Sequence, residues 1–419
     1  MSPITIVLVL AIVAAFYMAW NIGANDVANA MGTSVGSGAL TLMGAVVAAG
    51  IFEFAGAALV GTQVTETIRK GIVEVALFEP GGMFGEDGPL ILAIGMLSAL
   101  IAAGLWLQLA TMAGLPVSTT HSIVGAVIGF ALIAIGPEAV DWGTVRQIVA
   151  SWVVSPALGG IIAAAMFLII SHGILQKEDP IAATRRLGPH LVALVIFLLV
   201  LSFIYKALKN VVKDPHWGLV LGSAAVLALL AFLLARVWLN PIRAREDKPF
   251  NFVEKVFGRL QIVTACFVAF AHGANDVANA VGPLAAVVQI HAVGELPSKV
   301  PVPFWILVLG GAGIVVGLAT WGYKVIATIG KKIIELTPTR GFSAEFGAAV
   351  TVLIASRLGM PVSTTHTLVG AVVGVGLARG LAALNLRVVG KIVNSWLATL
   401  PVAAGLSALL FVVLRALLT

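Results

Sequence analysis

The sequence predicts an all-α polytopic membrane protein with about 12 transmembrane elements, arranged as an inverted-topology repeat with broken or re-entrant helices. Three observations predict this fold: an apolar composition, two motifs that each occur twice, and opposite charge in equivalent loops. Of the 419 residues, 60% are hydrophobic and 11% are charged. Soluble domains are roughly one-quarter charged. The composition therefore places the chain in a bilayer.

Apolar stretches define the membrane elements, because a spanning helix needs about 20 largely apolar residues. The predicted elements are 4–20, 40–62, 90–113, 122–135, 145–170, 190–206, 217–239, 260–271, 303–329, 344–358, 367–384 and 393–417. Several of them are short, so we expect some elements to enter the membrane without crossing it.

The remaining composition excludes several classes of protein. Arg69 is the first basic residue, so we expect residues 1–20 to stay as a membrane helix and not to be cleaved as a signal peptide. Cys266 is the single cysteine, which excludes an intramolecular disulfide and a thiolate metal cluster. The net charge of +6 lies in short loops, where it indicates membrane orientation and not nucleic-acid binding. We expect a multi-pass protein of the cell (inner) membrane.

Two motifs occur twice and divide the chain. GANDVANA occupies 23–30 and 273–280, and PVSTTH occupies 116–121 and 361–366. The separations are 250 and 245 residues, so the two copies align almost without gaps. The sequence therefore predicts a first repeat, a linking section with two helices, and a second repeat. Their ranges are 1–170, 171–259 and 260–419.

Loop charge indicates that the two repeats have opposite orientations. Residues 63–89 carry two basic and five acidic residues, whereas the equivalent loop 330–343 carries three basic and one acidic residue. By the positive-inside rule these loops lie on opposite sides of the membrane. The linking loops 171–189 and 240–259 are rich in Lys and Arg, so we expect both on the cytoplasmic side. This is the charge pattern of an inverted repeat, which many secondary transporters use.

GANDVANA supplies candidate cation ligands. Asp26 lies between apolar stretches, where a carboxylate costs at least about 2.5–3.5 kcal/mol. In a helix that opens at the Gly-Ala pair, Asn25, Asp26 and Asn29 share one face. Carboxylate and amide oxygens are hard ligands that suit Na⁺. The alternative is a simple helix N-cap. The second copy supplies Asn275, Asp276 and Asn279.

PVSTTH supplies a candidate anion site. Pro116 and Pro361 predict helix breaks, which are tolerated at membrane depth only where they are buried in protein or line a cavity. The hydroxyls that follow stand at a new helix N-terminus, where free N–H groups and the dipole attract anions. The alternative is capping without a ligand. These hydroxyl residues are Ser118, Thr119, Thr120, Ser363, Thr364 and Thr365. His121 and His366 follow them, either as donors to backbone carbonyls or as proton carriers.

Two further acids break the symmetry of the copies. Glu53 lies within an apolar span, and Glu345 aligns with Leu100 of the first half. We expect Glu53 and Glu345 to act as further cation ligands, although Glu345 could instead mark the end of a span. Gln63 is a possible accessory ligand, and we interpret Arg357 as an interfacial charge.

The stretches 1–62, 90–145 and 344–356 hold no Lys and no Arg. An anion near these carboxylates would be repelled unless cations entered with it. Coupled entry of a cation and an anion is therefore the expected use of the site. An enzyme is not expected, because no nucleophile and base or metal triad with catalytic spacing occurs.

The paired motifs, GANDVANA followed about 90 residues later by PVSTTH, resemble the inorganic phosphate transporter (PiT) family, and the resemblance covers both halves. It implies a prokaryotic-type phosphate symporter, generally a homodimer, coupled to Na⁺ or, in some bacterial members, to H⁺ or a metal-phosphate complex. By this resemblance Asp26, Asp276, Glu53 and Glu345 match essential acids of the family, and Ser118 and Ser363 match critical serines.

We therefore expect a secondary active transporter that takes up inorganic phosphate with Na⁺ by alternating access, with no other cofactor. Asn25, Asn275 and the hydroxyls would hold phosphate near the midplane, and Na⁺ would bridge it to Asp26, Asn29, Asp276 and Asn279. The alternatives are a proton-coupled phosphate or metal-phosphate symporter and a sulfate permease. From outside this class, a channel or a membrane scaffold remains.

Overall fold

The computed structural model describes residues 2–61, 72–207, 216–239, 248–294, 302–357 and 362–419, and these form helices joined by short loops. The first half contains α1 (Pro3–Gly36), α2 (Leu42–Val60), α4 (Gly88–Met112), α5 (Thr119–Ala134) and α6 (Trp142–Ile170). The linking section contains α7 (Pro180–Ala207) and α8 (Trp217–Leu239). The second half contains α9 (Pro249–Asp276), α10 (Ala278–Val293), α11 (Phe304–Trp321), α12 (Tyr323–Lys331), α13 (Pro338–Arg357), α14 (Thr364–Arg379) and α15 (Leu386–Leu418).

The predicted all-α membrane fold is confirmed, and every predicted element falls mainly on helix. Within the described ranges, nine helical segments are long and apolar enough to cross a membrane. The predicted elements 122–135 and 367–384 correspond to α5 and α14, which have only 16 residues each. The stretch 303–329 is two helices and not one, because the chain divides at Gly322 into α11 and α12.

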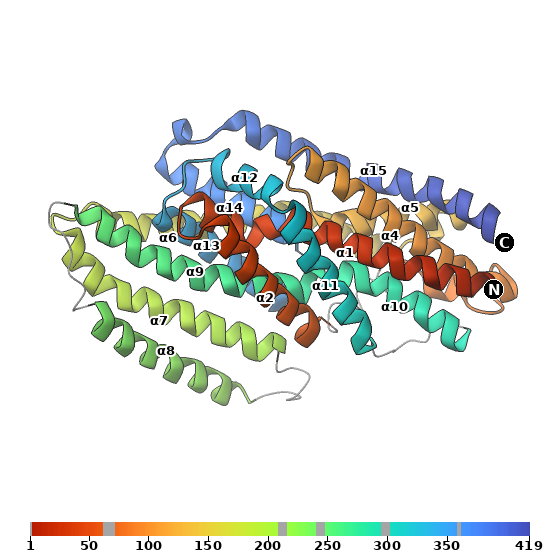
Figure 1. Cartoon of the computed structure of the whole chain (residues 1–419), viewed down its shortest axis with the longest axis horizontal. Coiled ribbons are helices and arrows are strands. Elements are labelled where there is room, and N and C mark those ends of the chain that lie inside the picture. Colours follow the sequence, from red (N-terminus) through yellow and green to blue (C-terminus); the bar gives the residue numbers. More distant parts are fainter. Residues whose placement is uncertain (1, 62–71, 208–215, 240–247, 295–301, 358–361) are drawn as a thin grey trace.

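The two sequence halves interlock and are not separately packed bodies. Helix α1 packs on α11 and α12, α2 on α9, α5 on α15, and α6 on α13 and α14, so most large contacts join one half to the other. Figure 1 shows α7 and α8 at one edge of this bundle, with α7 between α8 and α9. Helices α1 and α9, which carry the two GANDVANA copies, run in opposite directions in this view. That direction supports the inverted repeat, which stays a prediction.

The prediction that a helix opens at the Gly-Ala pair of GANDVANA is wrong. Helix α1 runs unbroken through residues 23–30, and α9 contains Gly273 in its last turn. The glycines serve a different purpose. A Cβ on Gly23 would lie 1.9 Å from the carbonyl oxygen of Ile314, and one on Gly273 would lie 2.0 Å from that of Glu53. The glycines therefore let α1 approach α11 and let α9 approach α2, as small residues do in membrane helix pairs.

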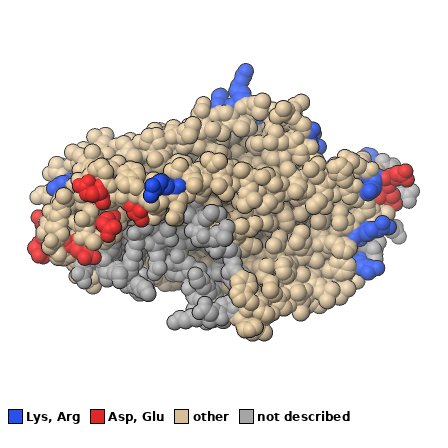
Figure 2. Space-filling view, turned by 180° about the vertical axis from the view of Figure 1, so that it is seen from behind, with Lys and Arg blue, Asp and Glu red and all other residues tan. Residues whose placement is uncertain are grey.

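The two ends of the bundle differ in charge (Figure 2). At the end that holds the N-terminus of α1 and the C-terminus of α15, an isolated bridge joins Val73 to Val140. Exposed acids surround this bridge: Glu74, Glu79, Glu86, Asp87, Glu138 and Asp141. Hydrogen bonds from the backbone and hydroxyl of Thr144 hold the pKa of Asp141 below its usual value. We call this the acidic end. Basic residues mark the starts of α7, α9 and α13 at the opposite end, which we call the basic end and expect to face the cytoplasm.

Candidate functional site

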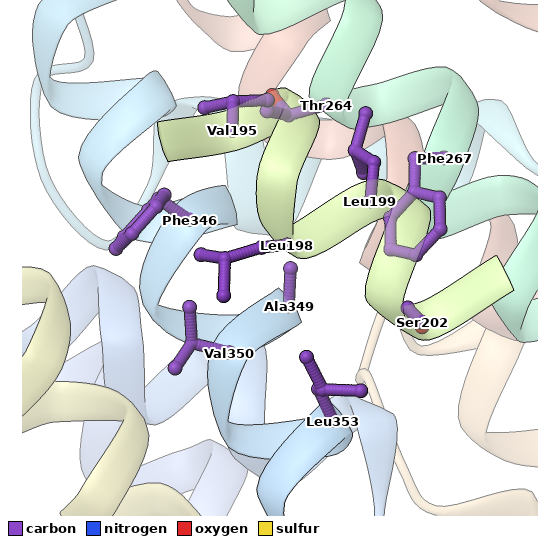
Figure 3. Close-up of a pocket in the computed structure, with 10 residues that line it drawn as sticks. All are labelled: Val195, Leu198, Leu199, Ser202, Thr264, Phe267, Phe346, Ala349, Val350 and Leu353. Carbon is purple, nitrogen blue, oxygen red and sulfur yellow. The ribbon is translucent and has the colours of Figure 1, made fainter. Parts of the chain in front are cut away.

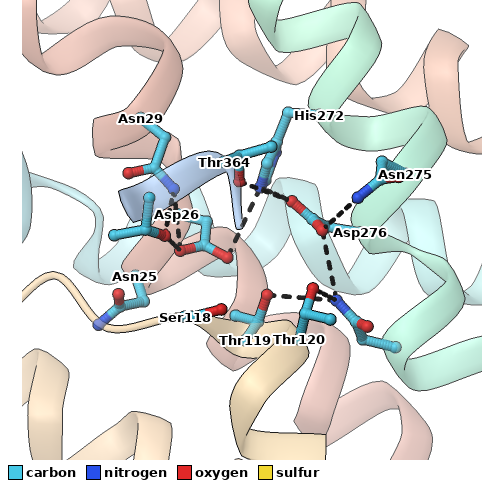
Figure 4. Close-up of polar contacts among 12 residues, drawn as sticks. Asn25, Asp26, Asn29, Ser118, Thr119, Thr120, His272, Asn275, Asp276 and Thr364 are labelled. Carbon is cyan, nitrogen blue, oxygen red and sulfur yellow. Dashed lines mark hydrogen bonds and ion pairs between the residues drawn. The ribbon is translucent and has the colours of Figure 1, made fainter. Parts of the chain in front are cut away.

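Asp26 lies at the centre of the bundle on α1 and is fully buried. The Asn29 amide, one turn later, donates to Asp26 Oδ1 over 3.1 Å and to the Thr365 hydroxyl over 2.8 Å. The Thr365 hydroxyl lies 3.1 Å from the same carboxylate oxygen. The predicted cation ligands of the first half are therefore in contact with the helix tip of the second half (Figure 4).

Asp276 lies opposite, at the C-terminal end of α9. Its Oδ1 accepts from the Asn275 amide over 2.9 Å, and its Oδ2 accepts from the Thr364 hydroxyl over 3.2 Å. The Asn279 amide reaches across to the first half, 3.2 Å from the Thr119 hydroxyl and 3.4 Å from that of Thr120. Both halves thus contribute acids and hydroxyls to one centre.

His272 stands between the acids and was missed by the sequence analysis. Its Nε2 lies 2.8 Å from Asp276 Oδ2 and 3.7 Å from Asp26 Oδ2, and its Nδ1 lies 3.3 Å from Glu53 Oε1. One signal could have revealed it. The second copy reads HGANDVANA where the first has Ile22, so a histidine stands four residues before an intramembrane aspartate, which is a spacing that places two side chains on one helix face.

Glu53 completes the central cluster from α2. It is fully buried, and neither carboxylate oxygen has a hydrogen-bond partner among the described residues, although His272 lies beside it. Helix α2 reaches this depth because Gly56 and Gly273 allow it to lie directly against α9. Asp26, Glu53 and Asp276 therefore surround one imidazole, and we call these four residues the central cluster.

Glu345 does not join the central cluster. Its Oε1 accepts from the Thr33 hydroxyl over 2.6 Å and the Ser34 hydroxyl over 2.8 Å, and its Oε2 accepts from the Thr264 hydroxyl over 2.5 Å. The Gln261 amide adds a fourth bond of 3.1 Å to Oε1. The two glutamates that break the symmetry therefore occupy different environments: Glu53 faces a basic ring, and Glu345 faces neutral donors.

The hydroxyl residues stand at helix N-termini as predicted, and the first serine of each motif also caps its helix, while the anion site stays a prediction. Ser118 caps α5 by accepting from the backbone N–H of His121, and Ser363 caps α14 by accepting from that of His366, both over 3.2 Å. The first helix break precedes α5, with Gly114 in the left-handed region at φ +65°. The second break, at residues 359–361, lies outside the described residues, as do Gln63 and the side chain of Arg357.

Asn25 holds the first break in place. Its amide nitrogen donates to the Thr111 hydroxyl over 2.9 Å and to the Leu115 carbonyl over 3.1 Å, and its oxygen accepts from the Val117 N–H over 3.1 Å. Both ends of this amide are therefore used by the loop between α4 and α5. Asn25 positions that loop, whereas Asn275 is bonded to Asp276.

The two motif histidines meet behind the helix tips. The rings of His121 and His366 lie 4.5 Å apart at 90°. Trp152 packs on His121 at 4.0 Å, and Trp396 stacks on His366 at 3.8 Å. The Trp396 indole N–H also donates to the Pro116 carbonyl over 3.0 Å. This aromatic cluster joins α5 and α14 and keeps the two tips at a fixed separation.

The site combines negative side chains with two positive helix ends. Asp26, Glu53 and Asp276 are buried, and in the part of the chain that the structure describes their only basic partner is His272. The N-termini of α5 and α14 point their free N–H groups and hydroxyls at the same region. Such an arrangement suits an anion and hard cations bound together.

Residues 22–407 match the sequence model of the phosphate transporter family. A relative from Pyrococcus abyssi, provisionally named a phosphate permease, is 47% identical over 97% of this chain and 98% of its own length. The chloroplastic inorganic phosphate transporter 2-1 of Arabidopsis thaliana is 46% identical over 94% of this chain and 70% of its own length. A solved structure described as the sodium-dependent phosphate transporter superposes with a TM-score of 0.87 at 44% identity, covering 98% of this chain and 99% of that one.

Proposed function

Because the chain belongs to the phosphate transporter family, we propose that it is a secondary active transporter that carries inorganic phosphate into the cell by symport with Na⁺. The observation that carries this proposal is the central cluster, in which three buried carboxylates and one imidazole face the N-termini of α5 and α14. Phosphate transport follows from the family, which is one of transporters and not of enzymes. Sodium coupling is supported by the ligand chemistry and by the similarity to a sodium-dependent transporter.

Phosphate binds, in this proposal, between the two helix tips. Backbone N–H groups at the starts of α5 and α14 and the hydroxyls of the six motif residues supply its donors. These hydroxyl residues are Ser118, Thr119, Thr120, Ser363, Thr364 and Thr365. Asn275 adds an amide from α9, and Asn25 acts indirectly, because its amide is engaged with the loop that precedes Ser118.

Sodium ions bridge the phosphate to the acids. Asp26 with Asn29, and Asp276 with Asn279, each offer a carboxylate and an amide oxygen one turn apart, which are ligands that hard cations prefer. Each cation reduces the repulsion between phosphate and the buried carboxylates. Glu53 belongs to the same centre, and Glu345 forms a separate ion site or gate. Phosphate and sodium each favour the binding of the other in this proposal, and this is the physical basis of the coupling.

The cycle alternates the centre between the two ends of the bundle, as rocking of repeat-derived units does in other transporters. The central cluster is buried, which supports a cycle with a closed step. We further propose that the protein is a homodimer of the cell (inner) membrane.

A proton-coupled phosphate symporter is the second candidate, and the observation that favours it is His272. This imidazole contacts three carboxylates and belongs to the residue type that most readily exchanges a proton near neutral pH. Uptake of ³²P-phosphate into proteoliposomes separates the two candidates. An inward Na⁺ gradient at constant pH should accelerate uptake at least tenfold. Acceleration by a proton gradient alone, with no response to Na⁺, would replace the sodium proposal by the proton one.

A further inference from the structure

Two adjoining cavities run beside the central cluster, between α7, α9 and α13. The first reaches the site itself, because Asn29, His272 and Thr364 are among its lining residues. The second is shown in Figure 3. The two cavities are adjacent, because they share four lining residues: Ser202, Phe267, Ala349 and Leu353.

The cavities extend from the site toward the basic end. Along α9 the lining passes from His272 back to Thr264, eight residues or about 12 Å of helix. Along α13 it passes from Leu353 back to Phe346. Helix α9 runs from the basic end toward the centre (Figure 1). Following the lining residues backward along α9 and α13 therefore leads from the centre toward the basic end. The far cavity ends at Thr264, whose hydroxyl donates to Glu345.

The walls between these ends are largely apolar. Phe267, Leu198 and Leu353 line the second cavity from α9, α7 and α13 (Figure 3), and Ser202 and Thr264 are the polar side chains among its lining residues. A narrow apolar constriction excludes water and hydrated ions, which is how hydrophobic gates close. Phe267 and Leu353 line both cavities and are the large apolar side chains that the two have in common.

We propose that these adjoining cavities are the path by which phosphate and its cation leave the site toward the basic end, with Phe267 and Leu353 forming the closure and α7 its outer wall. The path rests on the proposed transport function and deepens it. It also gives the linking section a role, since α7 belongs to neither repeat yet lines both cavities through Ser202. Glu345 stands beside the outer part of the path, where a carboxylate attracts the departing cation.

Cysteine labelling tests the path directly, because Cys266 is the only native cysteine and can be replaced by serine. In that background we would introduce Ser202→Cys or Ala349→Cys and apply a charged, membrane-impermeant methanethiosulfonate reagent to each face of oriented vesicles. The control is Phe203→Cys, whose side chain is adjacent to Ser202 but 48% exposed on the outer surface of the bundle. We expect both path positions to react from the face that labels Lys332→Cys, at least tenfold more slowly when Na⁺ and phosphate are present. The control should show no protection by cargo.

Three results would overturn the path. They are reaction only from the opposite face, reaction at both positions with a permeant maleimide but not with the impermeant reagent, and reaction that cargo does not slow. The second result would mean that the cavities open to the bilayer. If phosphate protects both positions and Na⁺ adds nothing, the path stands and the sodium coupling fails, so the two proposals are tested separately.

Discussion

At the scale of single residues, the feature that most constrains the site is His272, because one imidazole lies within 3.7 Å of three carboxylates. Removing one partner of a buried charged group leaves the others uncompensated, which costs about 3–5 kcal/mol. His272 therefore stabilises the buried acids, and in the proposed cycle it yields its contacts when cations bind Asp26 and Asp276.

Replacing His272 with alanine should lower the thermal unfolding temperature of the detergent-solubilised protein by several degrees and abolish phosphate uptake, because three buried acids lose their basic partner. Adding Asp276→Asn should restore much of the stability and none of the uptake. The matched control is His291→Ala on the exposed end of α10, which should change neither quantity. Wild-type stability in His272→Ala would show that the imidazole does not compensate the acids.

The cap serines give a second prediction at this scale. Ser118→Ala removes the acceptor for the His121 N–H and should cost about 1 kcal/mol of local stability, together with a several-fold increase in KM for phosphate. Ser122→Ala, whose hydroxyl bonds back to the Ser118 carbonyl, is the control and should leave KM within twofold of wild type. Equal KM values for the two variants would remove Ser118 from the phosphate site.

At the scale of helices, glycines decide where the site residues lie. Gly23 and Gly273 stand at contacts where a Cβ would be 2.0 Å or less from a backbone oxygen of the neighbouring helix. This packing explains why the predicted helix openings did not occur. The letters Gly-Ala are compatible both with a helix start and with a close crossing, and only the position of the partner helix distinguishes the two.

Gly273→Ala should separate α9 from α2 and move Glu53 away from His272. The expected cost is at least about 1–3 kcal/mol, with more than 90% of uptake lost. Gly222→Ala on α8, where a Cβ meets nothing within 4 Å, should be tolerated and stabilise the protein by about 0.5–1 kcal/mol. Thermal unfolding and ³²P uptake measure both variants. Normal uptake by Gly273→Ala would contradict the crossing as the support of the site.

Several elements of the site could be predicted from the sequence, and others could not. The acids, amides and hydroxyls of the two motifs are recognisable because polar residues at membrane depth are costly. The contacts between these residues cannot be recognised from the sequence, because Asp26 contacts Thr365 of the other half only through the interlocked packing of the helices. Likewise, the separation of Glu345 from Glu53 depends on how far α13 and α2 are displaced along the bundle, which loop lengths do not determine.

At the scale of the whole molecule, charge divides the bundle into an acidic and a basic end, and equivalent loops of the two halves lie at different ends. The bridge between Val73 and Val140 joins the first-half loops, and the Asn385 N–H donates to the Ile333 carbonyl to join the second-half loops over 3.0 Å. In a Cys266→Ser background, Glu86→Cys and Lys332→Cys should therefore react with an impermeant reagent from opposite faces of oriented vesicles. Reaction from the same face would refute the inverted repeat.

The central claim is that one centre binds phosphate and sodium together, so that neither crosses alone. The most direct test exchanges the driving and the driven solute, so that a phosphate gradient drives sodium entry. Proteoliposomes with equal Na⁺ on both sides receive an inward phosphate gradient, and ²²Na⁺ entry is followed at constant pH. We expect ²²Na⁺ to accumulate transiently above equilibrium, and Asp276→Asn to abolish this accumulation. Phosphate entry at the normal rate with no net movement of ²²Na⁺ would contradict the claim.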